Sequence, residues 1–407
     1  MTVPLKHRLS ARLAFSALVR CIAVALSAMV AAPAVLAQGA KLKVGIILPH
    51  SGGFAPQGMA IENGFRLALQ EQGGRLAGRD VEFVRADEDP DPARVAEAAA
   101  RLVSTDKVDV LLGPLGVASA SAVAGVTRES GTLHFLPAGG VAGLTGAQCA
   151  KNIFRTSYSY WQSGYAIGIE MSRRPRVKTM AFVAVRSAAG EELVKGFRDG
   201  FVKGGGKIGR ELWLASPVGE FKASLDELAL SRPDAVFAAF TGATAVRFIR
   251  EYAVSALTKT TPLVGSGFLT EGLLDAAGAS ASGIETALHY VDSMETPKNK
   301  AFRLAYVKAF KQQPDLNAVA GYDSAYLLAA GLKATRGDAA RPAEIIAAIE
   351  KAPVDSPRGP WKLSRAHNPV QDHYLRKVVG AESRINGIAV RQLDDDPANS
   401  AACRMGG

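Results

Sequence analysis

Short apolar runs alternate with amphipathic helical segments along this chain, and the whole alternation occurs twice. One series runs through 42–136 and the second through 179–264. Within the first series, Ile61, Phe65 and Leu69 recur at the spacing of one helix face. Strands that alternate with helices form parallel sheets with both faces covered. The sequence therefore predicts an α/β fold with two similar lobes.

The last part of the chain departs from this alternation. Three helical segments are expected at 302–310, 318–334 and 343–351, followed by a strand pair at 374–379 and 385–390. Helices that follow two complete lobes must pack back onto one of them. We therefore expect the chain to pass between the lobes more than once.

Residues 1–37 have the three parts of a secretory signal peptide. A basic segment ends at Arg20, an apolar stretch follows, and small residues stand before a cleavage point after Ala37. The alternative is a membrane anchor. It is disfavoured because Arg20 and Pro33 confine the apolar run to roughly 12 residues, whereas about 20 are needed to span a bilayer. An exported protein is the prediction.

Cleavage after Ala37 leaves two cysteines, Cys149 and Cys403. An oxidising compartment favours disulfides, and two cysteines allow a single pairing. Two unconnected thiols are the alternative, since the sequence does not show whether the residues meet. We expect a disulfide between Cys149 and Cys403.

Charge and motif content exclude several functions. The net charge is +10, but four bases lie in the predicted leader, which leaves +6 on the mature chain. The mature chain has no basic run with interleaved aromatic residues. Nucleic-acid binding is therefore not expected. No H-E-x-x-H, G-x-S-x-G or phosphate-loop pattern is present. We predict a binding protein with no catalytic residues, no cofactor and no metal, and interpret the acidic cluster at 87–89 as a solvated turn.

Several motifs then occur in an order that is specific as a set. They are the opening strand and loop Val44–Phe54, the turn Val110–Pro114, the crossover Asn152–Ser157, the late helix Gly321–Tyr326, and Pro357–Pro360 with His367–Gln371. Together they span essentially the whole mature chain. They resemble the periplasmic branched-chain amino-acid binding proteins, which are type I solute receptors of ABC importers.

This resemblance implies both a fold and a function. The fold would be two Rossmann-like lobes joined by three crossovers, with 38–156 plus 290–360 in the N-terminal lobe and 157–289 plus 361–407 in the C-terminal lobe. The protein would be a periplasmic monomer that traps a small solute and delivers it to permease subunits in the membrane. A sensor that signals to another partner stays open as an alternative, and a secreted hydrolase is disfavoured.

The positions that align with the family's ligand contacts differ from those of amino-acid binders. Val117 and Gly140 stand where two hydroxyl side chains are usual, and Ala189 replaces a tyrosine. The loop at 265–268 has no acidic residue before Glu271. A free ammonium group would therefore be left unpaired, at a cost of several kcal/mol. We predict a carboxylate-bearing or neutral organic solute, aromatic ones included, rather than leucine or valine.

The predicted ligand-binding set comes from loops beyond the carboxyl ends of the strands, with one residue from the late helix. Its members are Phe54, Gln57, Val117, Ala118, Ala138, Gly139, Gly140, Ala189, Thr241, Phe268 and Tyr322. Tyr322 has a core position as its alternative, and Phe54 has packing under its own loop. Tyr158 and Trp161, beside the first crossover, are open to either hinge packing or cleft lining.

Overall fold

The computed structural model describes residues 41–405, apart from Gly139 and Val141. The predicted signal peptide lies outside the described residues. Within the described range, no helix combines the length and the apolar character that crossing a bilayer requires.

The sheet of the N-terminal lobe has β1 at its centre, paired in parallel with β3 on one side and β4 on the other. Only the edge hairpin between β2 and β3 is antiparallel. In spatial order the strands are β2 (Arg75–Leu76), β3 (Arg79–Asp87), β1 (Leu42–Leu48), β4 (Val110–Leu112), β5 (Leu133–Leu136) and β6 (Ile153–Arg155).

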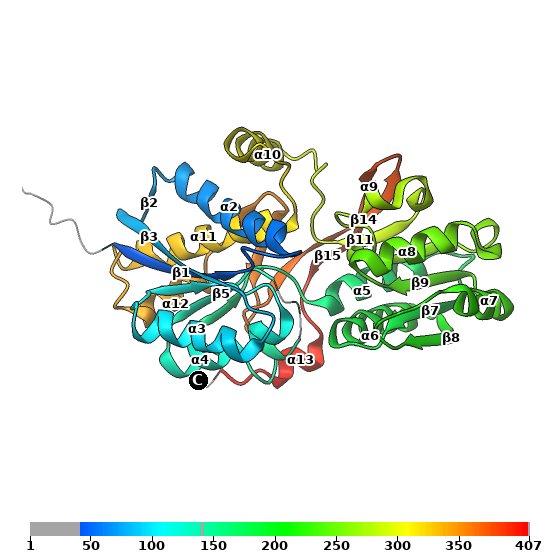
Figure 1. The fold of residues 1–407 in the computed structure, drawn as a ribbon, viewed down its shortest axis with the longest axis horizontal. Coiled ribbons are helices and arrows are strands. Elements are labelled where there is room, and N and C mark those ends of the chain that lie inside the picture. Colours follow the sequence, from blue (N-terminus) through cyan, green and yellow to red (C-terminus); the bar gives the residue numbers. More distant parts are fainter. Residues whose placement is uncertain (1–40, 139, 141, 406–407) are drawn as a thin grey trace, which may run out of the picture. The chain divides into compact units, whose positions relative to one another are not determined.

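Helices cover both faces of this sheet (Figure 1). Val44 and Ile46 of β1 point into the core beneath α2 and α11, whereas Ile47 points to the opposite core beneath α3 and α4. Both faces of the strand are thus apolar, as a buried parallel strand requires. The helices of this lobe are α2 (Ala55–Glu71), α3 (Pro92–Ser104), α4 (Val117–Ser130), α10 (Pro297–Phe310), α11 (Leu316–Ala334) and α12 (Pro342–Ile349).

The sheet of the C-terminal lobe repeats this arrangement. Its parallel part follows the order β8, β7, β9, β10, β11, which matches β3, β1, β4, β5, β6 of the other lobe. The strands of this lobe are β7 (Thr179–Val185), β8 (Lys207–Leu214), β9 (Ala235–Ala239), β10 (Leu263–Ser266), β11 (Glu285–Leu288), β14 (Pro369–Val379) and β15 (Glu382–Leu393). Through β14 the sheet continues into β12 (Val354–Ser356) and β13 (Gly359–Leu363), whose apolar residues lie in the core of the N-terminal lobe. The predicted pair of similar α/β lobes is confirmed.

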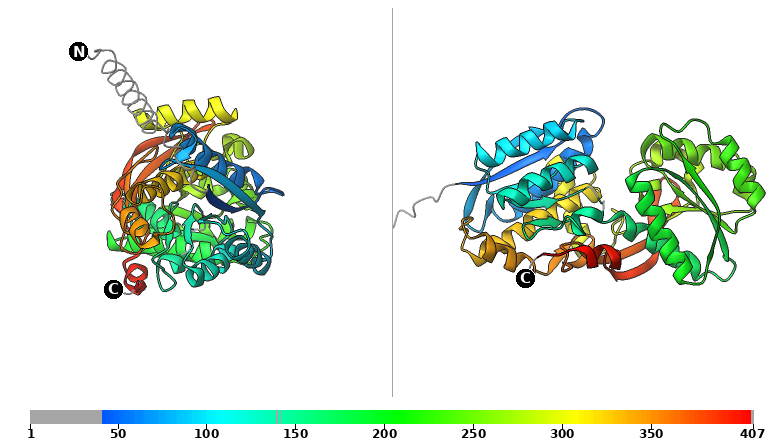
Figure 2. Two further views of the ribbon diagram at one scale, coloured as in Figure 1. Left: turned by 90° about the vertical axis from the view of Figure 1, so that its left-hand side faces the viewer. Right: turned by 90° about the horizontal axis from the view of Figure 1, so that it is seen from below.

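Two pairs of helices cover the two faces of the C-terminal sheet. Apolar residues of α5 and α6 share one core with alternate residues of β7, and residues of α7 and α8 share the other. The helices are α5 (Tyr160–Ser172), α6 (Ala188–Lys203), α7 (Lys222–Ser231), α8 (Gly242–Ala253), α9 (Leu274–Ala277) and, in the tail, α13 (Pro397–Ala402) (Figure 2).

The chain passes between the lobes after β6, after β11 and between β13 and β14. Arg358 holds the first crossover, because its Nη1 and Nη2 donate to the carbonyls of Ser157 and Thr156, each at 2.9 Å. The same guanidinium lies 3.0 Å from the carboxylate of Asp323, and both side chains are about 1% exposed. A buried ion pair therefore fixes the backbone at the start of the hinge.

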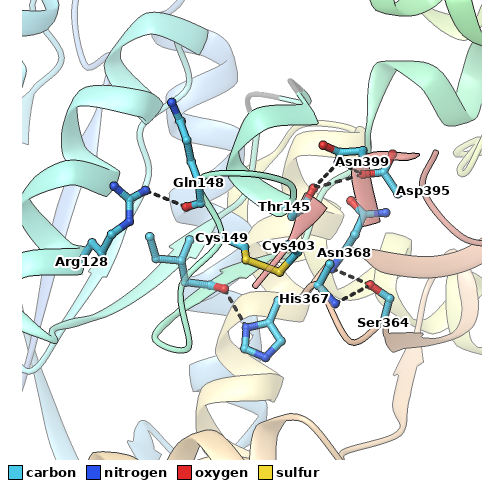
Figure 3. The surroundings of a disulfide bond; sticks show 12 residues. Arg128, Thr145, Gln148, Cys149, Ser364, His367, Asn368, Asp395, Asn399 and Cys403 are labelled. Carbon is cyan, nitrogen blue, oxygen red and sulfur yellow. Dashed lines mark hydrogen bonds between the residues drawn. A yellow bond between two sulfur atoms is a disulfide. The ribbon is translucent and has the colours of Figure 1, made fainter. Parts of the chain in front are cut away.

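The C-terminal tail ends on the N-terminal lobe (Figure 3). The disulfide between Cys149 and Cys403 is present, as expected, and joins residues 254 apart in sequence. The family resemblance places residues 361–407 in the C-terminal lobe. β14 pairs with β11 of that lobe, whereas the tail beyond Leu393 contacts Thr145 and Cys149 of the N-terminal lobe.

Candidate ligand-binding site

The loops that follow β1, β4 and β5 lie at one edge of the N-terminal sheet, because these parallel strands are neighbours. They carry most of the N-terminal-lobe residues predicted to bind ligand, namely Phe54, Gln57, Val117, Ala118, Ala138 and Gly140. Gly139, also predicted, lies outside the described residues. Ala138 is 2% exposed and Phe54 is 66% exposed. Phe54 therefore does not pack under its own loop.

The acidic turn after β3 ties these loops together. The carboxylate of Asp87 accepts from the His50 amide at 2.7 Å and from Ser51 Oγ at 2.6 Å, and these hydrogen bonds lower the pKa of Asp87. Glu88 accepts from the amides of Leu115 and Gly116, each at 2.8 Å. The cluster is open to solvent, with Asp87 exposed, and precedes the capped helix α3, as predicted. Its carboxylates also fix the backbone around the predicted site.

Two helices, α2 and α4, begin at this edge, and their N-termini differ. Among the described residues, no side chain caps α4, which begins at Val117. In α2, which begins after Phe54, the amides of Ala55 and Gln57 already donate to the carbonyls of Gly52 and Phe54. Val117 is partly exposed and Ala118 is exposed. Free amide groups at a helix N-terminus attract anions. Gln57, in the first turn of α2, has a buried Oε1 with no hydrogen-bond partner in the described part of the chain.

Gly140 is packed against the ring of Tyr158. A Cβ atom on Gly140 would stand 2.7 Å from Cε2 of that ring and 3.0 Å from the Tyr158 carbonyl oxygen. The ring therefore fills the space that a side chain at position 140 would need. Of the two aromatic residues left open by the sequence, Tyr158, which is 7% exposed, packs beside the predicted loop residues. Trp161 is 5% exposed and donates to Asp199 within the C-terminal lobe.

Phe268 brings the C-terminal lobe to the same place. Its ring lies 4.7 Å from that of Tyr158 and 5.5 Å from that of Tyr160, measured between centroids. The aromatic group therefore joins Phe268, which follows β10, to Tyr158 and Tyr160 beside the first crossover. Through Tyr158 it also contacts Gly140 in the loop after β5. Ala189 and Thr241 lie at the starts of α6 and α8, after the neighbouring strands β7 and β9, and Thr241 makes no side-chain cap.

Arg376 holds the Phe268 loop in place through hydrogen bonds to residues on either side of Phe268. It donates to the Gly267 carbonyl at 3.1 Å and to the Thr270 hydroxyl at 3.2 Å. Its Nη1 also lies 2.6 Å from the carboxylate of Glu271. Glu271, the first acidic residue after the loop, is therefore already paired with a buried cation.

His289 extends the aromatic group and was not predicted. It follows β11 directly, and its ring lies 5.3 Å from Tyr158 and 6.2 Å from His373. Both histidines are buried, and none of their ring nitrogens has a partner among the described residues. Burial lowers the pKa of His289 far below its usual value and that of His373 to about 3, so both rings are neutral. The sequence signal was a histidine at the carboxyl end of a strand.

Tyr322 does not join this group. Its hydroxyl donates to Glu71 at 2.6 Å, and its ring packs edge-on against Phe302. Glu71 is the last residue of α2, whereas Phe54 precedes the first, and a helix of 17 residues is about 25 Å long. Tyr322 therefore lies in the core at the far end of α2, which corrects its place in the predicted set.

Among the described residues, no cluster of three or more His, Cys, Asp or Glu side chains could hold a metal ion. The arrangement offers aromatic surfaces, backbone amides and a neutral histidine. Such groups suit the binding of a small organic molecule with an apolar body and a few polar points.

Comparison with known proteins agrees with this architecture. The profile of the periplasmic binding protein family matches residues 41–383. The chain is 28% identical over 352 residues to the Leu/Ile/Val-binding protein homolog 6 of Brucella melitensis, which covers 84% of this chain and 88% of the relative. The chain therefore belongs to the periplasmic binding protein family, whose members are solute receptors rather than enzymes.

Solved structures of solute-binding proteins are similar to this chain over most of its length. A solute-binding protein of an ABC transporter from Rhodopseudomonas palustris, in complex with benzoate, superposes with a TM-score of 0.80 and 41% identity, over 90% of this chain and all of that one. A second from that organism, in complex with 3,4-dihydroxybenzoic acid, has a TM-score of 0.77 and 30% identity, over 86% and 98%. The leucine-binding protein of Thermotoga maritima shares the fold, with a TM-score of 0.73 and 20% identity, over 85% and 98%.

Proposed function

We propose that this protein is the periplasmic receptor of an ABC importer and that its solute is a monocyclic aromatic carboxylate of the benzoate class. The observation that carries the proposal is the packing of Tyr158 on Gly140 beside Phe268. It makes an aromatic wall where the amino-acid binders of the family have a hydroxyl side chain. The relatives with benzoate and 3,4-dihydroxybenzoic acid support the same solute class.

The aromatic group suits a ring-shaped ligand. Tyr158, Tyr160 and Phe268 meet at tilted or edge-on angles. Aromatic rings favour such offset and edge-to-face contacts, which contribute about 0.5–1.5 kcal/mol beyond area burial. In our proposal the ligand ring packs on this group, and its carboxylate takes hydrogen bonds from the uncapped N-terminus of α4 at Val117 and Ala118.

An α-amino acid fits the same residues poorly. Its ammonium group needs a carboxylate partner, and Glu271, the acid nearest in sequence to the Phe268 loop, is engaged by Arg376 at 2.6 Å. Burial of an unpaired ammonium costs several kcal/mol. An aromatic acid lacks that group, so its binding avoids the penalty.

Transport requires no chemistry from this chain. In the proposed cycle the signal peptide at 1–37 directs export, the monomeric receptor closes on the solute, and permease subunits in the membrane receive it. A ligand that touches Gly140 in one lobe and Phe268 in the other favours the closed state by its differential affinity for that state.

A thermal-shift panel tests the solute class. Benzoate, 4-hydroxybenzoate, an aliphatic carboxylate and leucine are compared at equal concentration, because only a ligand of the native state raises the melting temperature. We expect shifts with the aromatic acids alone. Phe268→Leu should reduce those shifts, whereas Leu230→Ala, a change at a side chain that is 84% exposed, should preserve them. A shift with leucine and none with the aromatic acids would overturn the proposal.

A further inference from the structure

The tail beyond β15 connects the two lobes a further time. On the N-terminal lobe, the Asp395 carboxylate accepts from Thr145 Oγ1 at 3.1 Å and from Asn399 Nδ2 at 2.7 Å, and Cys403 is bonded to Cys149 (Figure 3). Asp395 is 3% exposed. The docking is thus both polar and covalent.

The same tail is also attached to the C-terminal lobe. Gln162, in the first turn of α5, donates to the Leu393 carbonyl at 2.9 Å. Lys195 of α6 lies 2.7 Å from the carboxylate of Asp396. Within a few residues, therefore, the tail holds elements of both lobes, in addition to the three crossovers.

The N-terminal-lobe end of this connection borders the loop that contains Gly140. In sequence, Gly140 stands two residues before the 3-10 helix Ala142–Thr145, on which the tail docks. The amide of Ala142 donates to Glu192 of α6 at 2.7 Å, so the same segment also contacts the C-terminal lobe. The tail thus supports the backbone from which Gly140 meets Tyr158.

We propose that the disulfide-anchored tail positions the ligand loop after β5 and limits how far the lobes separate, with Asp395 and Asn399 as positioning residues. The inference rests on the proposed function for its ligand readout. Loss of the tail's docking makes the closed, binding-competent state less populated. The apparent affinity for the ligand then falls in proportion to the population of that state. Couplings of this kind typically change affinity 5- to 150-fold.

A matched pair of glycine substitutions tests the docking without touching the disulfide. A Cβ on Gly146 would stand 1.8 Å from Asn399 Oδ1, whereas one on Gly143 would make an ordinary contact with the Gln148 side chain, at 3.6 Å or more. We expect Gly146→Ala to weaken benzoate binding about tenfold and Gly143→Ala to leave it unchanged, in calorimetry under non-reducing conditions. Equal affinity of folded Gly146→Ala and wild type would overturn the inference.

A second experiment is independent of the ligand. Small-angle scattering compares the ligand-free wild type before and after reduction by a phosphine, with circular dichroism to verify that the reduced protein stays folded. We expect a larger radius of gyration after reduction, because the tail no longer restrains the lobes. An unchanged radius in the folded, reduced protein would overturn the inference. If benzoate binds to no form, the proposed function fails, and the scattering comparison still decides the role of the tail.

Discussion

The ring of Tyr158 lies over the backbone of Gly140, so closely that a Cβ atom there would come within 2.7 Å of Cε2. Glycine at this position and tyrosine at the crossover therefore depend on each other. In amino-acid binders of the family, a hydroxyl side chain usually occupies the position of Gly140. Here the same space is filled by an aromatic surface, which is completed by Phe268 from the other lobe.

Gly140→Ala tests this dependence. The added methyl must displace the Tyr158 ring, and overpacking of this kind costs typically 1–3 kcal/mol. We expect benzoate affinity to fall about tenfold or more in calorimetry, since 1.4 kcal/mol corresponds to a factor of ten. Gly125→Ala is the control, because a Cβ there meets nothing within 4 Å. Unaltered affinity in Gly140→Ala would show that Tyr158 is not part of the binding surface.

Loss of the Cys149–Cys403 disulfide should lower stability strongly. The bond closes a loop with a sequence separation of 254, and the chain-entropy model gives about 5 kcal/mol for loops longer than a hundred residues. We expect a lower melting temperature in the double serine variant. Mass spectrometry of the exported, non-reduced protein first tests whether the disulfide forms. Two free thiols would contradict the pairing of Cys149 with Cys403.

Asp323→Asn should destabilise the protein through the hinge. The change leaves Arg358 buried without its 3.0 Å carboxylate partner, and breaking a buried ion pair costs about 3–5 kcal/mol. Asp226→Asn breaks an exposed pair with Lys222, and the resulting loss of stability should be much smaller because solvent screens the pair. Chemical denaturation of both variants makes the comparison. Equal losses would mean that the buried pair does not hold the first crossover.

Glu192 should make stability depend on pH. Burial raises the pKa of this carboxyl from 4.5 to about 7, although the Ala142 amide opposes the shift. The folded state then binds more protons than the unfolded state between these values. The contribution of Glu192 to stability is present below about pH 4.5 and is lost as pH rises through about 7.

Comparison with Glu192→Gln isolates this effect. Between pH 4.5 and 7, the unfolding free energy of the wild type should fall by about 1–3 kcal/mol more than that of the variant. Urea unfolding at several pH values measures the difference. Parallel pH profiles for the two proteins would rule out a raised pKa at position 192.

The fold could be predicted because its determinants are local. Strands such as Leu42–Leu48 are short and apolar, and capped helices such as the one that begins after Asp91 follow them; the Asp91 carboxylate accepts from the Ala93 amide. The disulfide followed from compartment and count alone. The course of the tail could not be predicted, since Asp395 and Thr145 are 250 residues apart.

The site was predicted less completely for a physical reason. Strand ends identify loops, but they do not say which side chains cross from one lobe to the other. Tyr158 became interpretable only through its contact with Gly140, and His289 through its place beside Tyr158. Tyr322 was misplaced because α11 is apolar on nearly every face, so spacing alone does not identify the face that meets α2.

The most direct test of the central claim is calorimetric titration of the mature, oxidised protein with benzoate and with leucine under identical conditions. We predict saturable binding of benzoate at one site per chain and no measurable binding of leucine, because the site has an aromatic wall and Glu271 is already paired with Arg376. Tight binding of leucine with no heat from benzoate would contradict the account.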